Sequence, residues 1–88
     1  LLSFVAAKEE PIAGGRHKVF GSLPLNVPPQ TSTIASHLPK AVGAAISIGR
    51  ARDLELADAK LDPHSVILCS FGDASLNHST AVGAINMA

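Results

Sequence analysis

An apolar run followed by a Gly-Asp turn occupies residues 65–73, which read SVILCSFGD. Residues 66–69 follow one another without a polar interruption, a pattern typical of a β-strand that is buried on both faces. Strict alternation of polar and apolar residues would instead indicate a strand with one exposed face. The stretch therefore predicts a strand inside a parallel sheet that helices cover on both sides.

Helices are predicted on either side of this strand. Residues 40–56 are apolar at first and charged towards the end, as in a helix that is buried at its start and exposed later. Gly43 and Gly49 would each cost ~1 kcal/mol relative to alanine, so we expect close packing of a neighbouring backbone in return. Residues 79–88 read as a second helix, and residues 53–64 as a polar connection that Pro63 ends. Residues 40–88 thus form a helix-strand-helix unit, the building block of an α/β fold.

The residues before this unit carry most of the helix-breaking signals. Residues 1–13 read as the tail of a helix, ended by Pro11 and the glycines that follow. Residues 14–39 contain four of the six prolines and read as a long loop, which is uncommon in a compact domain unless the loop binds something. Its last part is rich in hydroxyl groups. Both ends of the chain look abrupt, so residues 1–88 are predicted to be part of a single domain that is truncated at both ends.

Length and composition limit the classes of function. Eighty-eight residues suffice for one domain at most, and the formal charge of zero argues against nucleic-acid and anionic-membrane partners. No run approaches the ~18 apolar residues of a membrane span, and the first residues lack the basic start of a secretory signal. Cys69, the single cysteine, cannot form an intrachain disulfide and is expected to be a buried small hydrophobe. We expect a soluble intracellular protein.

The residues with the chemistry of a ligand site follow the predicted strand. Ligands of parallel α/β sheets bind outside the carboxyl ends of the strands, and Gly72 and Asp73 lie there. Glycine allows a tight turn, the carboxylate is a hard oxygen ligand, and Mg²⁺ commonly takes one or two carboxylates together with phosphate oxygens. A Gly-Asp pair is also frequent in ordinary turns, so a purely structural role is the alternative.

Other familiar site patterns do not occur in the sequence. The four histidines lack the spacing of a zinc site, and Gly14-Gly15-Arg16 lacks the Lys-Ser/Thr of a phosphate-binding P-loop. Neither G-x-G-x-x-G after a strand nor the G-x-S-x-G of serine hydrolases is found. We expect His78 to be a surface residue near the start of the last helix.

Two stretches together resemble a known family. Residues 31–45, TSTIASHLPKAVGAA, and residues 71–88, which open with FGDAS and close with AINMA, are similar to the diphosphate-binding (α-type) region of thiamine-diphosphate-dependent 2-oxo acid dehydrogenase E1 components, the pyruvate and branched-chain group. The resemblance covers about residues 14–88. It implies part of a thiamine-diphosphate-binding fold, a parallel sheet flanked by helices, with residues 14–39 as the loop on the cofactor side.

The resemblance also implies roles for particular residues. Asp73 would bind the Mg²⁺ that holds the cofactor's diphosphate, and the residues around it would place backbone or hydroxyl donors near the phosphates: Gly72, Ala74 and Ser75. Ala74 replaces the last glycine of the family's Gly-Asp-Gly, a departure that concerns local backbone angles. The motif's closing asparagine would lie beyond residue 88, so this chain would hold part of the metal site.

The hydroxyl-rich loop would contact the other end of the cofactor. Ile34 matches the apolar residue that the family wedges beneath the bent cofactor, and Ser32 matches the polar position just before it. Ordinary core packing is the alternative for Ile34. His37 stands where other members often carry glutamine, and either faces the cofactor or satisfies a loop carbonyl. The family's activating glutamate and catalytic histidines lie outside the matched segment, so no catalytic residue is assigned.

The implied activity is oxidative decarboxylation of a 2-oxo acid with thiamine diphosphate and Mg²⁺, followed by transfer of the acyl group to a lipoyl carrier. The implied partners are a complementary β-type E1 subunit or domain and a lipoyl-bearing acyltransferase of a multienzyme complex, in an oligomer. The expected location is the bacterial cytoplasm, or the mitochondrial matrix in a eukaryote, and the chain alone should be inactive. Two alternatives stay open: a transketolase-like transferase that uses the same cofactor, and a non-enzymatic α/β fragment.

Overall fold

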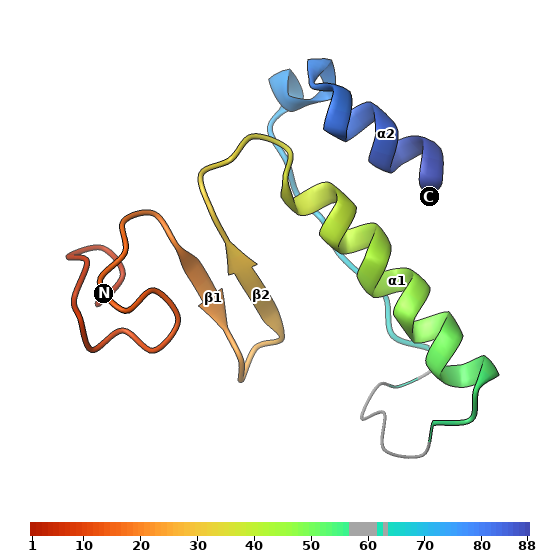
Figure 1. Cartoon of the computed structure of the whole chain (residues 1–88), viewed down its shortest axis with the longest axis horizontal. Helices are drawn as coiled ribbons and strands as arrows, with labels where there is room; N and C mark the ends of the chain where they lie inside the picture. The colour runs from red at the N-terminus through yellow and green to blue at the C-terminus, as the bar shows by residue number, and fades with distance from the viewer. Residues whose placement is uncertain (57–61, 63) are drawn as a thin grey trace. The chain divides into compact units, whose positions relative to one another are not determined.

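The computed structural model describes residues 1–56, 62 and 64–88, which divide into two compact units, Leu1–Thr33 and Ile34–Ala88. Figure 1 shows the elements of both units in chain order, namely β1 (Phe20–Ser22), β2 (Val27–Gln30), α1 (His37–Asp53), the short 3₁₀ helix η1 (Asp73–Asn77) and α2 (Ser79–Met87). The division falls inside the hydroxyl-rich segment, so the two stretches of the family resemblance do not lie wholly in one unit.

Successive turns fill the start of the first unit. Over residues 1–15, all of them described, turns replace the helix tail predicted for residues 1–13. Ala6 has a φ of 49°, in the left-handed region that a right-handed helix excludes, and Pro11 has no N–H to donate. Gly14 and Gly15 have φ values of 54° and 83°. The predicted helix tail was wrong because backbone reversals at these residues outweigh the apolar composition.

A β-hairpin lies within the predicted loop of residues 14–39. Strands β1 and β2 pair antiparallel, with Phe20 opposite Gln30 and Ser22 opposite Val27, so the pairing contains a bulge. Asn26, at a φ of 53°, completes the connecting turn. Part of residues 14–39 therefore has regular secondary structure, although the sequence predicted a loop throughout. Two prolines in β2 concealed the strand, because proline cannot donate to a sheet and is confined to edges.

Helix α1 begins at His37, three residues before the predicted start, and ends at Asp53 rather than near residue 56. Pro39 lies in its first turn, where the N–H groups have no partner within the helix and proline is tolerated. A Cβ built on Gly43 or Gly49 would meet no described atom within 4 Å. The close approach predicted at these two glycines is therefore not made by the described residues.

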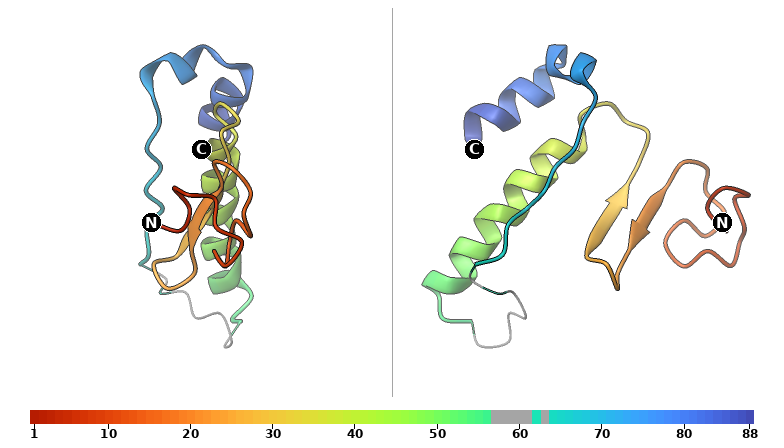
Figure 2. Two further views of the ribbon diagram at one scale, coloured as in Figure 1. Left: turned by 90° about the vertical axis from the view of Figure 1, so that its left-hand side faces the viewer. Right: turned by 180° about the vertical axis from the view of Figure 1, so that it is seen from behind.

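The second unit is built on α1. Helix α2 packs against α1, and the buried apolar residues of this unit come from both helices and the segment before α1: Ala35, Leu38, Ala81 and Ala84. Residues 65–72 return along α1 in an extended conformation (Figure 2). Cys69 packs against this core. Two helices flank the extended segment, as predicted for residues 40–88, but the segment is not a paired strand in the described residues.

The extended segment differs from the predicted strand in what covers it. Residues 65–71 have no β-partner among the described residues, where the paired strands are the antiparallel β1 and β2. Val66 and Leu68 are 87% and 94% exposed, whereas Ile67 between them is 42% exposed. One side therefore faces α1 and the other is bare, against the predicted burial on both faces. The parallel sheet stays a prediction, since it needs strands besides those described.

The predicted polar connection at residues 53–64 and its end at Pro63 lie in part outside the described residues. Residues 57–61 and Pro63 are not described.

Among the described residues, no helix combines the length and apolar character needed to cross a bilayer.

Candidate functional site

The Gly-Asp turn lies where the extended segment ends and the helices of the second unit resume. Gly72 is extended, with φ −75° and ψ 145°, and Asp73 is the first residue of η1. The Ser75 N–H donates to the Gly72 carbonyl over 2.9 Å, and this hydrogen bond closes the turn. Helix α2 begins six residues after Asp73. The local order of extended segment, carboxylate and helix is the order that a ligand site in an α/β fold requires.

The Asp73 carboxylate is exposed and oriented by its neighbour. Its Oδ1 accepts the backbone N–H of Ala74 at 2.8 Å. Among the described residues, Asp73 belongs to no group of three or more His, Cys, Asp or Glu side chains that could hold a metal ion. One carboxylate with water or phosphate oxygens matches the coordination that Mg²⁺ accepts, whereas zinc sites need three or four protein ligands.

Ala74 fits its position without the glycine of the family motif. It is not among the described residues that have a positive φ, so this backbone conformation does not require glycine. Its N–H is engaged by Asp73, so Ala74 helps to orient the carboxylate and does not offer that donor to a phosphate. Ser75, the next residue of η1, is half-buried.

The segment before α1 lies close to the Gly-Asp turn. His37 Nε2 is 2.9 Å from the Ser70 carbonyl oxygen, a hydrogen bond between residues that are 33 positions apart. Ala35, at a φ of 60°, is buried against α2 in the core of the second unit. These two contacts bring the middle of the first resembling stretch close to α2, which belongs to the second stretch, and to Ser70, which directly precedes the second stretch. Of the two roles considered for His37, the contact matches a bond to a carbonyl.

The two loop residues expected to meet the cofactor have different surroundings. Ile34 is 62% exposed, so it is not a core residue of the second unit. Ser32 is exposed and belongs to the first unit, and its position is described within that unit alone. The structure therefore brings Ile34, but not Ser32, into the same unit as Asp73.

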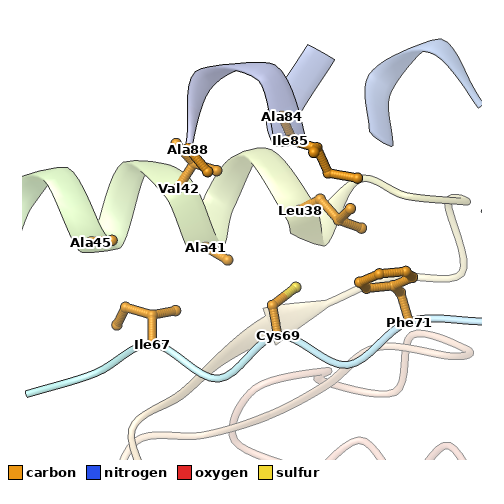
Figure 3. A pocket seen from close by; sticks show the side chains of 10 residues that line it. All are labelled: Leu38, Ala41, Val42, Ala45, Ile67, Cys69, Phe71, Ala84, Ile85 and Ala88. Carbon is orange, nitrogen blue, oxygen red and sulfur yellow. The ribbon is translucent and has the colours of Figure 1, made fainter. Parts of the chain in front are cut away.

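An apolar pocket of about 240 Å³ lies elsewhere in the second unit, between α1, α2 and the extended segment. Figure 3 shows the side chains of Ile67, Cys69 and Phe71 on one wall, with Leu38 and Ala41 of α1 opposite. Asp73 does not line this pocket. Cys69 is half-buried here as a free thiol, rather than fully buried as predicted.

Sequence reasoning missed the pocket and the partner of His37. Ile67, Cys69 and Phe71 occur at every second residue, which places them on one face of an extended segment and could have predicted one wall of the pocket. The prediction of a strand buried on both faces made no distinction between the two faces. No sequence signal marks Ser70 as the partner of His37, because a backbone carbonyl accepts a hydrogen bond whatever its side chain.

Comparison of the chain with protein-family models, curated proteins and solved structures finds no match. Function is therefore inferred from the residues and their arrangement.

Proposed function

We propose that this chain is the diphosphate- and Mg²⁺-binding part of the E1 component of a thiamine-diphosphate-dependent 2-oxo acid dehydrogenase. The observation that carries the proposal is the bond from His37 Nε2 to the Ser70 carbonyl oxygen. It joins the first stretch that resembles the family to the residue directly before the second stretch, although 33 residues separate the bonded pair. An exposed carboxylate three residues after Ser70 supports the same assignment.

The residues of the chain would have distinct parts in binding. Asp73 would give Mg²⁺ one carboxylate oxygen, held in orientation by the Ala74 N–H. The Gly72 backbone and the Ser75 hydroxyl would be donors near the phosphates. Ile34 would offer an exposed apolar side chain to the cofactor rings, and Ser32, two residues before it in sequence, a polar one. When bound, thiamine diphosphate supplies the electron sink for decarboxylation, and the protein supplies orientation and electrostatics.

The proposal extends to partners. A complementary β-type E1 subunit or domain would contribute the catalytic groups, and a lipoyl-bearing acyltransferase would accept the acyl group. The reaction is then oxidative decarboxylation of a 2-oxo acid in the cytoplasm of a bacterium or in the mitochondrial matrix. The bare side of residues 65–71 is consistent with a sheet completed by further strands.

The test is titration calorimetry with thiamine diphosphate in the presence of Mg²⁺ and, separately, of EDTA. We expect Mg²⁺-dependent binding that Asp73→Asn weakens at least roughly ten-fold, by analogy with the about 1.5–3 kcal/mol of a hydrogen bond to a charged group. Asp53→Asn is the control, because Asp53 is an exposed carboxylate that pairs with Arg52 at the end of α1. Equal affinity of the Asp73→Asn variant and the unmodified chain would refute the proposal.

The alternative is that Asp73 has a purely structural role. The bond from the Ala74 N–H to Asp73 Oδ1 favours this alternative, because such a bond is typical of a local turn. Asparagine keeps an oxygen acceptor at this position, so Asp73→Asn should preserve the turn while it removes the charge. Unchanged stability together with lost Mg²⁺-dependent binding therefore favours the metal site over the turn alone. A transketolase-like transferase would bind the cofactor equally and would differ in transferring a ketol group between sugars.

A further inference from the structure

We infer that His37 is a positioning residue that ties the start of α1 to the end of the extended segment and thereby sets the place of the Gly72–Asp73 turn. The tie itself is the contact of 2.9 Å between His37 Nε2 and the Ser70 carbonyl oxygen. Its consequence for ligand binding rests on the proposed function, in which Asp73 binds Mg²⁺. His37 acts through Asp73 and is not itself a ligand.

The backbone of the extended segment is not held by a β-ladder. No backbone–backbone hydrogen bond joins residues 66–71 to another described residue. Apolar contacts of Ile67, Cys69 and Phe71 hold the segment against α1. Such contacts are non-directional, so they keep the segment near the helix without fixing how far it slides along it. A hydrogen bond with a preferred length and angle does fix that position.

Sliding by one residue would displace the Asp73 carboxylate considerably. An extended chain rises about 3.3 Å per residue, whereas a binding site tolerates errors of about 0.5 Å. Ser70 is three residues before Asp73, and the bond from the Ser75 N–H to the Gly72 carbonyl closes the turn that contains Asp73. A restraint at Ser70 is therefore passed to the carboxylate over a short length of chain.

The chemistry of the contact defines which side chains can replace histidine. A carbonyl oxygen accepts and never donates, so Nε2 must carry the proton. The glutamine side-chain nitrogen reaches about as far from the backbone as Nε2 of histidine, whereas the asparagine nitrogen lies nearer, at the position of Nδ1. Leucine has no donor. Glutamine should therefore restore the tie, and asparagine and leucine should not.

The test compares the His37→Gln, His37→Asn and His37→Leu variants of the full chain. Without ligand, we expect the Asn and Leu variants to shift the amide resonances of residues 70–73, while the Gln variant leaves them close to those of the unmodified chain. ¹⁵N spectra of the unmodified chain should show His37 protonated at Nε2. His17→Leu is the control, because His17 is an exposed histidine of the first unit.

The ligand-bound measurement is the affinity for thiamine diphosphate with Mg²⁺. We expect a loss of roughly three- to ten-fold in the Asn and Leu variants, the size of one hydrogen bond, and recovery in the Gln variant. Unshifted resonances in both the Leu and Asn variants, or no recovery with Gln, would overturn the inference. If instead Asp73→Asn leaves affinity unchanged while the resonances respond as expected, the tie stands and the proposed function fails.

Discussion

At the scale of single residues, the buried Glu10 organises the first turns of the chain. Its Oε2 accepts the backbone N–H of Ile12 at 2.9 Å and also that of Ala13, the buried apolar residue of the first unit. The carboxylate thus satisfies donors that the turn leaves free. Loss of the acceptor would strand those N–H groups in a site with little access to water.

We therefore expect Glu10→Ala to destabilise the first unit by about 1–3 kcal/mol, the cost of unsatisfied buried donors. Amide hydrogen exchange at Ile12 and Ala13 measures the effect. Glu9→Ala is the matched control, because Glu9 is the exposed neighbour and should change exchange little. If the two variants exchange alike, the carboxylate has no such role.

How far single residues were predictable depends on whether their partners are local. Asp73 is a candidate ligand from the sequence alone because glycine, carboxylate and the preceding apolar run are adjacent, and that role stays a prediction. The bond from His37 to Ser70 could not be predicted, since it joins positions 33 residues apart through a backbone carbonyl. Ala6 and Ala35 adopt positive φ values against the preference of alanine, so the residue type at these positions does not predict their conformation.

At the scale of elements, the glycines of α1 and β1 should respond to substitution in opposite directions. A Cβ on Gly43 or Gly49 meets no described atom within 4 Å, whereas a Cβ on Gly21 would lie 3.1 Å from both Pro29 Cα and Ile12 Cγ2. We expect Gly43→Ala and Gly49→Ala each to stabilise α1 by about 0.5–1 kcal/mol. Gly21→Ala should destabilise the hairpin.

Urea unfolding followed by circular dichroism measures the α1 variants, and amide exchange in β1 measures Gly21→Ala. A loss of stability in Gly43→Ala would contradict the open surroundings described above. Gly43→Ala and Gly49→Ala also test the packing predicted from the sequence. If they weaken association with a β-type partner while they stabilise the chain, a neighbouring backbone approaches α1 in that complex.

Elements were predictable where the local pattern was strong. The apolar start and charged end of residues 40–56 located α1 to within three residues at each end. The hairpin was missed because β1 has three residues and β2 four, two of them prolines. The burial of residues 65–71 could not be predicted from their own composition, because burial depends on which strands lie beside them.

At the scale of the whole molecule, the sequence carries more apolar surface than the described residues bury. Apolar residues make up 47% of the chain, yet Leu38 is the one buried apolar residue larger than alanine among those described. Hydrophobic stabilisation scales with buried apolar area, so each unit has a small driving force for folding. We infer that many of these exposed apolar side chains need more apolar surface to pack against than the described residues supply.

The bare side of residues 65–71 is where this surplus should have a measurable effect. The segment combines β-branched and aromatic residues with no charge and no proline, the composition of an aggregation-prone strand. The paired variant Val66→Thr/Leu68→Thr should reduce self-association of the chain, seen as a smaller sedimenting species. Stability should change by less than about 0.5 kcal/mol, since both side chains are already exposed. Ile67→Thr is the matched comparison: this side chain lines the pocket against α1, so the substitution should loosen the second unit by about 1 kcal/mol. Equal self-association of the paired variant and the unmodified chain would mean that another surface drives it.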